Sequence, residues 1–169
     1  MNKFPLFVLF VAFTTGVFAQ NSTKIDDRLN KTILHGRVTL EAFNMDVCKD
    51  WYSPEYKSYQ IKPGVLKKLQ NRNLEGITIS LVLGSWCHDT HREVPRFIKI
   101  LDAISFPYQH LNMNALDTHK TSPDFDTKAY QITRVPTAIV YRNGKEIGRI
   151  IESPKKSLEK DLLKILSKK

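Results

Sequence analysis

The stretch Ile77-Thr78-Ile79-Ser80-Leu81-Val82-Leu83-Gly84-Ser85-Trp86-Cys87-His88-Asp89-Thr90 decides the fold of this chain. Its first half is apolar and rich in β-branched residues, which predicts a strand buried on both faces. From Thr90 onward, apolar residues fall on one stripe of a helix, namely Val94, Phe97, Ile98, Ile100 and Leu101. Cys87 therefore stands where a buried strand passes into a helix.

Further elements are predicted on both sides of this strand and helix. Short helices are expected over 63–70 and 122–130, further strands over 108–113, 137–141 and 146–151, and a last helix beginning at Ser153 and Pro154. Asn143-Gly144 separates the last two strands and is the strongest short signal for a hairpin. A right-handed crossover makes the first two strands parallel, and the hairpin adds an antiparallel edge. The predicted fold class is α/β, a central mixed β-sheet flanked by helices on both faces.

The first nineteen residues have the pattern of a secretory signal peptide. A basic start is followed by the apolar run 4–13 and by the small residues of 17–19, which predicts cleavage before Gln20. The run is too short for a membrane span, so we expect an exported protein, periplasmic or secreted, with no stable span after signal removal. Residues 20–59 are expected to form an N-terminal extension with a turn at 51–54, and residues 60–169 the main domain.

The overall charge excludes some partners. The chain carries a formal net charge of +9, but its basic residues are spread rather than gathered in an Arg-rich groove with aromatic residues. This pattern indicates a solvated basic surface and argues against nucleic-acid binding. The chain also has no Gly-x-Ser-x-Gly, phosphate-binding loop or metalloprotease helix motif. We therefore expect no cofactor.

Three sequence features together resemble thioredoxin. Trp86-Cys87-x-x-Thr90 stands where that family has Trp-Cys-Gly-Pro-Cys, and Pro95 lies eight residues after Cys87, where the family has a proline in the active-site helix. Val135-Pro136-Thr137 matches the family's cis-proline segment. The resemblance covers about residues 62–167 and is greatest to an exported bacterial branch with Trp-Cys-x-Asp-Ser/Thr followed by Arg-Glu-Val-Pro. It implies a thioredoxin-like fold, a reactive Cys87 and a cis Pro136.

The chain departs from the family at three positions. Thr90 replaces the second cysteine, Leu81 aligns with the family's buried aspartate, and Glu152 aligns with a glycine near the motif. The resemblance also implies that the backbone of Val135 pairs with an extended substrate peptide. Pro136, Thr137 and Glu152 complete this expected substrate-binding group.

The candidate catalytic group is Trp86, Cys87, His88, Asp89 and Thr90. The positive end of the helix dipole and unpaired backbone N–H groups favour a thiolate at Cys87; a protonated His88 would add to this effect and Asp89 would oppose it. Thr90 has two interpretations: it caps the helix in a capping box with Glu93, or its hydroxyl donates to the Cys87 thiolate. The alternative for Cys87 itself is an inert cysteine at the end of a strand.

The second cysteine and the histidines leave further alternatives. Cys48 is either free or bridged to Cys87, and the bridge would close a loop of about forty residues. Cys87, His88 and His91 are of the residue types that hold copper or zinc, but no fourth ligand is evident and no metal site is predicted.

Two functional hypotheses follow from these residues. The first is single-thiol thiol–disulfide exchange or partner trapping through Cys87, with an enzyme of the monothiol oxidoreductase or isomerase type as its catalytic form. On this hypothesis we expect a monomer that acts on protein or small-molecule thiols and disulfides. The second is a redox-silent module that binds peptide or protein in the groove between Trp86 and Pro136.

Overall fold

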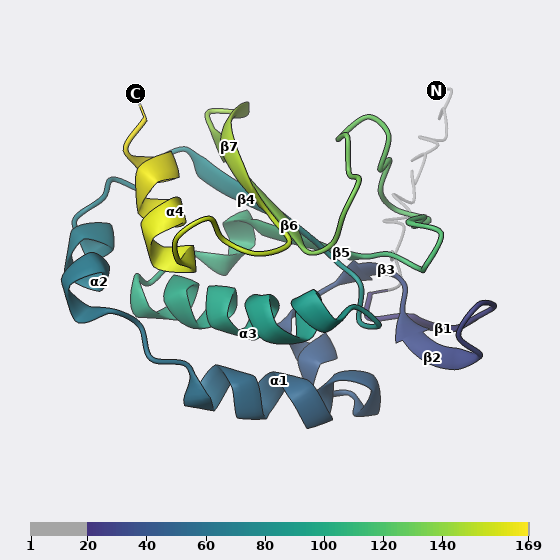
Figure 1. The fold of residues 1–169 in the computed structure, drawn as a ribbon. Helices are drawn as coiled ribbons and strands as arrows, with labels where there is room; N and C mark the ends of the chain where they lie inside the picture. The colour runs from purple at the N-terminus through teal and green to yellow at the C-terminus, as the bar shows by residue number, and fades with distance from the viewer. Residues whose placement is uncertain (1–19, 169) are drawn as a thin grey trace, which may run out of the picture.

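The computed structural model describes residues 20–168, so the predicted signal peptide lies outside the described residues. The elements, in chain order (Figure 1), are β1 Thr23–Asp26, β2 Lys31–Leu34, β3 Gly36–Val38, η1 Leu40–Asn44, α1 Asp46–Ser58, α2 Pro63–Gln70, β4 Ile77–Leu83, α3 His88–Ala103, η2 Tyr108–His110, β5 Leu111–Ala115, β6 Thr137–Arg142, β7 Lys145–Ile151 and α4 Leu158–Leu166. None of the helices in this part of the chain is long and apolar enough to cross a bilayer.

The central sheet has five strands in the order β3-β5-β4-β6-β7. The predicted buried strand is β4, which pairs parallel with β5 and antiparallel with β6, as the crossover and the hairpin require. Asn143 and Gly144 connect β6 to β7 with φ angles of 51° and 78°, the left-handed region that such two-residue turns need. The strand expected at 108–113 begins only at Leu111, because the preceding residues form the single turn η2.

All four α-helices pack on one face of this sheet. The main core joins alternate residues of β4 (Ile77, Ile79, Leu81 and Leu83) to apolar residues of all four α-helices. Figure 1 shows α3 beneath the sheet, with α1 on its far side and α2 and α4 toward one end. This layer buries the apolar stripe predicted for α3.

The other face of the sheet is covered by irregular chain from 116 to 136. The helix predicted over 122–130 does not form, and that prediction is wrong. Pro123 lies at its start, and the carboxylate of Asp126 accepts hydrogen bonds from the backbone N–H groups of Lys128 and Ala129, which stabilises a turn instead. The expected helical layer therefore covers only one of the two faces within residues 20–168.

The N-terminal extension contributes to the sheet and to the helical layer. β3 pairs antiparallel with β5 at the sheet edge, and α1 packs along α3. The turn predicted at 51–54 is wrong because these residues lie inside α1. Tertiary packing accounts for the helix, since the Tyr52 ring stacks on Phe43 with centroids 4.2 Å apart.

The last helix starts later than predicted. Ser157, rather than Ser153, is the N-cap of α4, and its side chain accepts a hydrogen bond from the backbone N–H of Lys160. Ser153 instead accepts a hydrogen bond from the Arg92 guanidinium, 2.7 Å away. The C-terminal segment is thereby connected to the first turns of α3.

Candidate functional site

Cys87 occupies the N-cap position of α3 and is half-buried. Its Sγ lies 3.2 Å from the carbonyl oxygen of Val135, to which the thiol donates. The peptide bond between Val135 and Pro136 is cis. The chain thus brings together, across 48 residues of sequence, the thiol and the proline segment that the sequence singled out.

The loop that presents Cys87 is fixed by hydrogen bonds on several sides. The Thr90 hydroxyl accepts from the backbone N–H of Gly84 at 3.3 Å, and the hydroxyl of buried Ser85 accepts from Leu34 of β2 at 2.9 Å. The Ser85 carbonyl oxygen lies 2.7 Å from Nε2 of His91, whose ring stacks on Trp51 of α1. These contacts join the loop to α3, α1 and the β1–β2 hairpin.

The capping-box prediction for Thr90 and Glu93 is wrong. The helix already begins at His88, so Thr90 lies in its first turn, fully buried, with its hydroxyl directed to the Gly84 N–H. The Glu93 carboxylate pairs with the guanidinium of Arg92 at 2.6 Å. Thr90 therefore holds the loop that precedes the thiol.

Trp86 packs on the apolar cluster formed by Val82, Leu116, Ile132, Val135 and Ile139. Its indole N–H donates to the Leu116 carbonyl oxygen at 2.9 Å. Gly84 permits this placement, because a Cβ there would stand 2.8 Å from the indole ring. The indole therefore forms a fixed wall beside Cys87.

The two residues after Cys87 differ in their exposure to solvent. His88 is exposed, and Asp89 is half-buried and pairs with Arg92 at 2.8 Å. The Asp89 charge is thus offset by a guanidinium one helical turn away, which weakens its expected opposition to a thiolate.

The expected substrate-binding residues lie around Pro136. Val135, Pro136 and Thr137 are buried, and the Thr137 hydroxyl donates to the Arg134 carbonyl oxygen at 2.7 Å. The backbone N–H of Glu152 donates to the Pro136 carbonyl oxygen at 2.7 Å, and its carboxylate pairs with Arg134. Glu152 has a φ of 54°, a left-handed conformation that favours the glycine with which it aligns.

Cys48 is unpaired, as is Cys87, and it is fully buried in α1. Burial raises the pKa of its thiol to about 12, so it is a poor nucleophile near neutral pH. No cluster of three or more metal-ligating side chains occurs in the described part of the chain. A metal centre at Cys87 would require His91 as a ligand. His91 instead contacts the Ser85 carbonyl oxygen through Nε2 and stacks on the Trp51 ring.

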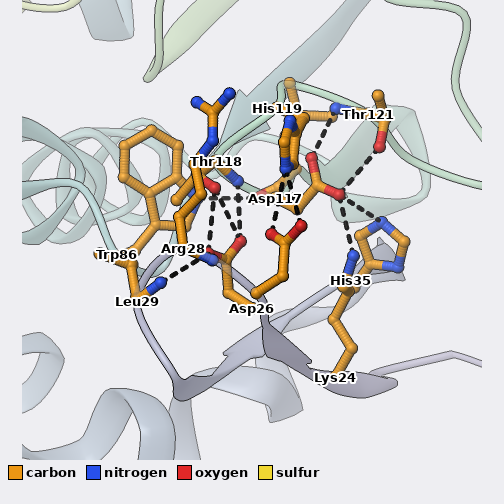
Figure 2. Close-up of polar contacts among 12 residues, drawn as sticks. Lys24, Asp26, Arg28, Leu29, His35, Trp86, Asp117, Thr118, His119 and Thr121 are labelled. Carbon is orange, nitrogen blue, oxygen red and sulfur yellow. Dashed lines mark hydrogen bonds and ion pairs between the residues drawn. The ribbon is translucent and has the colours of Figure 1, made fainter.

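A polar cluster that sequence reasoning missed fastens the β1–β2 hairpin beside the Cys87 loop (Figure 2). Asp26, fully buried, accepts from the backbone N–H and hydroxyl of Thr118, each at 3.0 Å. Asp117 accepts from the Lys24 ammonium at 2.9 Å and from the Thr121 backbone N–H at 2.8 Å. The pairs that join the hairpin to residues 117 and 118 are 93 and 92 residues apart in sequence, so no local pattern predicts these contacts.

Both carboxylates of this cluster are stabilised in their ionised form. Burial alone would raise the pKa of Asp26, but hydrogen bonds from Thr118 and from the backbone of the hairpin turn bring it below the usual value. Burial acts likewise on Asp117, and hydrogen bonds from Thr121 and Lys24 lower its pKa to about 2. The hairpin is therefore held by two charged groups that remain ionised at neutral pH.

Comparison with known proteins gives support at the level of fold. No protein-family model and no curated protein sequence match the chain. The topology, with a parallel central pair, an antiparallel hairpin and flanking helices, decides the fold class. The fold is thioredoxin-like.

Solved structures resemble the chain at low identity. A protein of unknown function from Pseudomonas aeruginosa matches with a TM-score of 0.56 and 11% identity, over 79% of this chain and 90% of its own. An HIV epitope-scaffold matches with a TM-score of 0.57 and 12% identity, over 78% and 92%. A thioredoxin from Malassezia sympodialis matches with a TM-score of 0.40 and 18% identity, over 55% and 77%.

This arrangement can support covalent chemistry at a single sulfur. A half-buried thiol stands at the start of a sixteen-residue helix, against a cis-proline segment, and Thr90, three residues further on, carries no sulfur. The second cysteine in the described residues is buried.

Proposed function

We propose that the protein performs thiol–disulfide exchange through Cys87 alone, either turning over mixed disulfides or trapping a partner. The observation that carries this proposal is the placement of the Cys87 thiol at the N-terminus of α3, half-buried and 3.2 Å from the Val135 carbonyl oxygen. Backbone N–H groups at a helix start stabilise a developing thiolate. Buried Cys48, with its raised pKa, does not compete for substrate.

The reaction begins when Cys87 loses its proton to solvent and gives up its hydrogen bond to Val135. The thiolate attacks one sulfur of a partner disulfide, forming a Cys87–partner mixed disulfide and releasing the other partner sulfur as a thiolate. An external thiolate then attacks the mixed disulfide, forms a new disulfide with the partner sulfur and frees Cys87 as thiolate. Each exchange breaks one S–S bond and forms one, so there is no net change in oxidation state.

The absence of a sulfur at Thr90 determines the type of reaction. Without an adjacent attacking thiol, the mixed disulfide persists until an external thiol resolves it. This behaviour suits isomerisation, thiol capping or partner trapping better than net oxidation or reduction of a dithiol. The fixed loop, held by Thr90 and Ser85, keeps Cys87 in one position through both steps.

The proposed partner is an extended peptide or a small thiol that lies between Trp86 and Pro136. The Val135 backbone would pair with the peptide, and Thr137 and Glu152 would shape the groove beside it. We further propose that the protein acts as a monomer outside the cytoplasm, in line with the signal-peptide pattern of residues 1–19.

An exchange assay tests this proposal. The purified protein is mixed with a glutathionylated model peptide, and peptide release and protein-bound glutathione are followed by mass. We expect one glutathione on Cys87, no reaction in Cys87→Ser and an unchanged rate in the matched control Cys48→Ser. If Cys87→Ser retains the activity, the proposal is wrong. If wild-type protein forms no adduct but binds the reduced peptide, a redox-silent binding module takes its place.

A further inference from the structure

A cavity lies on the helix-free face of the sheet, and Cys87 is not among the residues that line it. It has a volume of about 760 Å³, within the range typical of small-molecule sites. It is formed by strand residues and by the irregular segment that replaces the predicted helix over 122–130. The lining does not include Trp86, Cys87 or Pro136, so the cavity is separate from the candidate site around Cys87.

The floor of this cavity is polar although it lies on the central strands. Strand register places Thr78 and Ser80 of β4 beside Tyr141 of β6 and Asn112 of β5 on the same sheet face. Ser80 is buried, Thr78 and Tyr141 are half-buried and Asn112 is exposed, so their hydroxyl and carboxamide groups border the cavity at different depths. The floor therefore offers several neutral groups that can donate and accept hydrogen bonds.

Asn114 on β5 gives an independent indication of a ligand. Its side chain lines the cavity, the residue is only 8% exposed, and its Oδ1 has no hydrogen-bond partner among the described residues. A buried carboxamide oxygen without a donor is rare in folded proteins. The oxygen itself is shielded from solvent, so a ligand hydroxyl would supply the missing donor once the carboxamide turns toward the cavity.

The aromatic and charged residues in the walls of the cavity indicate the shape and the charge of the ligand. Phe125 and Tyr130 stack with centroids 4.6 Å apart, and Tyr130 is 42% exposed, so its ring is available to a ligand. Arg37 and Asp124 are the charged residues of the lining, and their formal charges cancel. The Asp124 carboxylate also accepts from the Arg37 backbone N–H at 2.9 Å.

We propose that this cavity binds a neutral polyhydroxylated molecule with the size of a mono- or disaccharide. Sugar hydroxyls donate and accept hydrogen bonds, as the amides and hydroxyls of the floor do, and the apolar C–H face of a sugar ring can pack on Tyr130. An apolar ligand would leave the polar floor without partners, and a charged ligand would meet no net opposite charge.

Titration of the purified chain, followed by amide NMR, tests the inference. Cellobiose and maltose are the neutral probes, glucose 6-phosphate the charged one and benzyl alcohol the apolar one. We expect saturable shifts at the Asn114 side-chain amide and at Ser80 with a neutral disaccharide. Tyr130→Ala and Asn114→Leu should each weaken binding about tenfold, while the matched exposed control Asn44→Leu should leave it unchanged.

Three results would overturn the inference. They are unchanged spectra with both disaccharides at millimolar concentration, equal or tighter binding of the charged or apolar probe, and unchanged affinity in Tyr130→Ala, which is exposed enough to be substituted without disturbing the core. The Cys87→Ser variant should bind the disaccharides as the wild type does, so this test and that of the proposed exchange activity can fail separately.

Discussion

Asp117→Asn tests the electrostatic attachment of the β1–β2 hairpin. The Asp117 carboxylate is almost fully buried and accepts from Lys24 and from the backbone and hydroxyl of Thr121 (Figure 2). The substitution removes the negative charge and replaces one acceptor oxygen with a donor, at nearly constant volume. It therefore removes the ion pair with Lys24 without creating a cavity.

The expected loss of stability follows from the pKa of this group. A pKa of about 2 in the folded state, against an ordinary value of 3.8, corresponds to about 2 kcal/mol of folding free energy at neutral pH. Because the folded pKa is the lower one, this contribution is complete above pH 3.8 and is lost as the pH falls through 3.8 toward 2. The difference between wild type and Asp117→Asn should shrink over the same interval.

Urea unfolding at a series of pH values from 7 to 2 measures the effect. We expect Asp117→Asn to be less stable by about 2 kcal/mol at pH 7 and close to wild type at pH 2. Asp27→Asn is the control, since the Asp27 side chain is 71% exposed and pairs with exposed His119. An equal loss at both ends of the pH series, or no loss at pH 7, would refute the reasoning.

Three further substitutions test other parts of the structure. Thr90→Cys should create a dithiol motif with Cys87, and intact mass should show the loss of two hydrogens on oxidation; an unchanged mass under oxidant, with both motif thiols free, would contradict this. Gly84→Ala should displace the Trp86 indole and destabilise the fold by about 1–3 kcal/mol, seen as a shifted tryptophan emission and a lower urea midpoint, whereas unchanged emission would count against the close approach. Ser157→Ala should cost about 1 kcal/mol in urea unfolding through loss of the α4 N-cap, and an unchanged midpoint would show that the cap contributes nothing.

The predictable parts of the fold are those with local or periodic signals. A short stretch of sequence is enough to predict β4, the apolar stripe of α3 and the Asn143-Gly144 turn. The helix predicted over 122–130 does not form because the Asp126 carboxylate accepts hydrogen bonds from the backbone N–H groups of Lys128 and Ala129, which favours a turn. The turn predicted over 51–54 failed because aromatic packing on Phe43 supports a helix there.

The candidate site also has parts that local sequence signals predict and parts that depend on tertiary contacts. Cys87, Trp86 and Pro136 could be selected from sequence, because a motif and its order along the chain mark them. The support for the loop could not, since Ser85 bonds to Leu34, 51 residues earlier, and Asp117 to Lys24, 93 residues earlier. Such contacts depend on tertiary structure and leave no local pattern.

The most direct test of single-thiol chemistry is the rate of alkylation of each cysteine in the native protein, followed against pH and resolved by peptide mass. We predict that iodoacetamide labels half-buried Cys87 in the folded protein, while fully buried Cys48 is labelled only after denaturation. A Cys87 that stays unlabelled until the protein unfolds, or that reacts no faster than Cys48, would contradict the account.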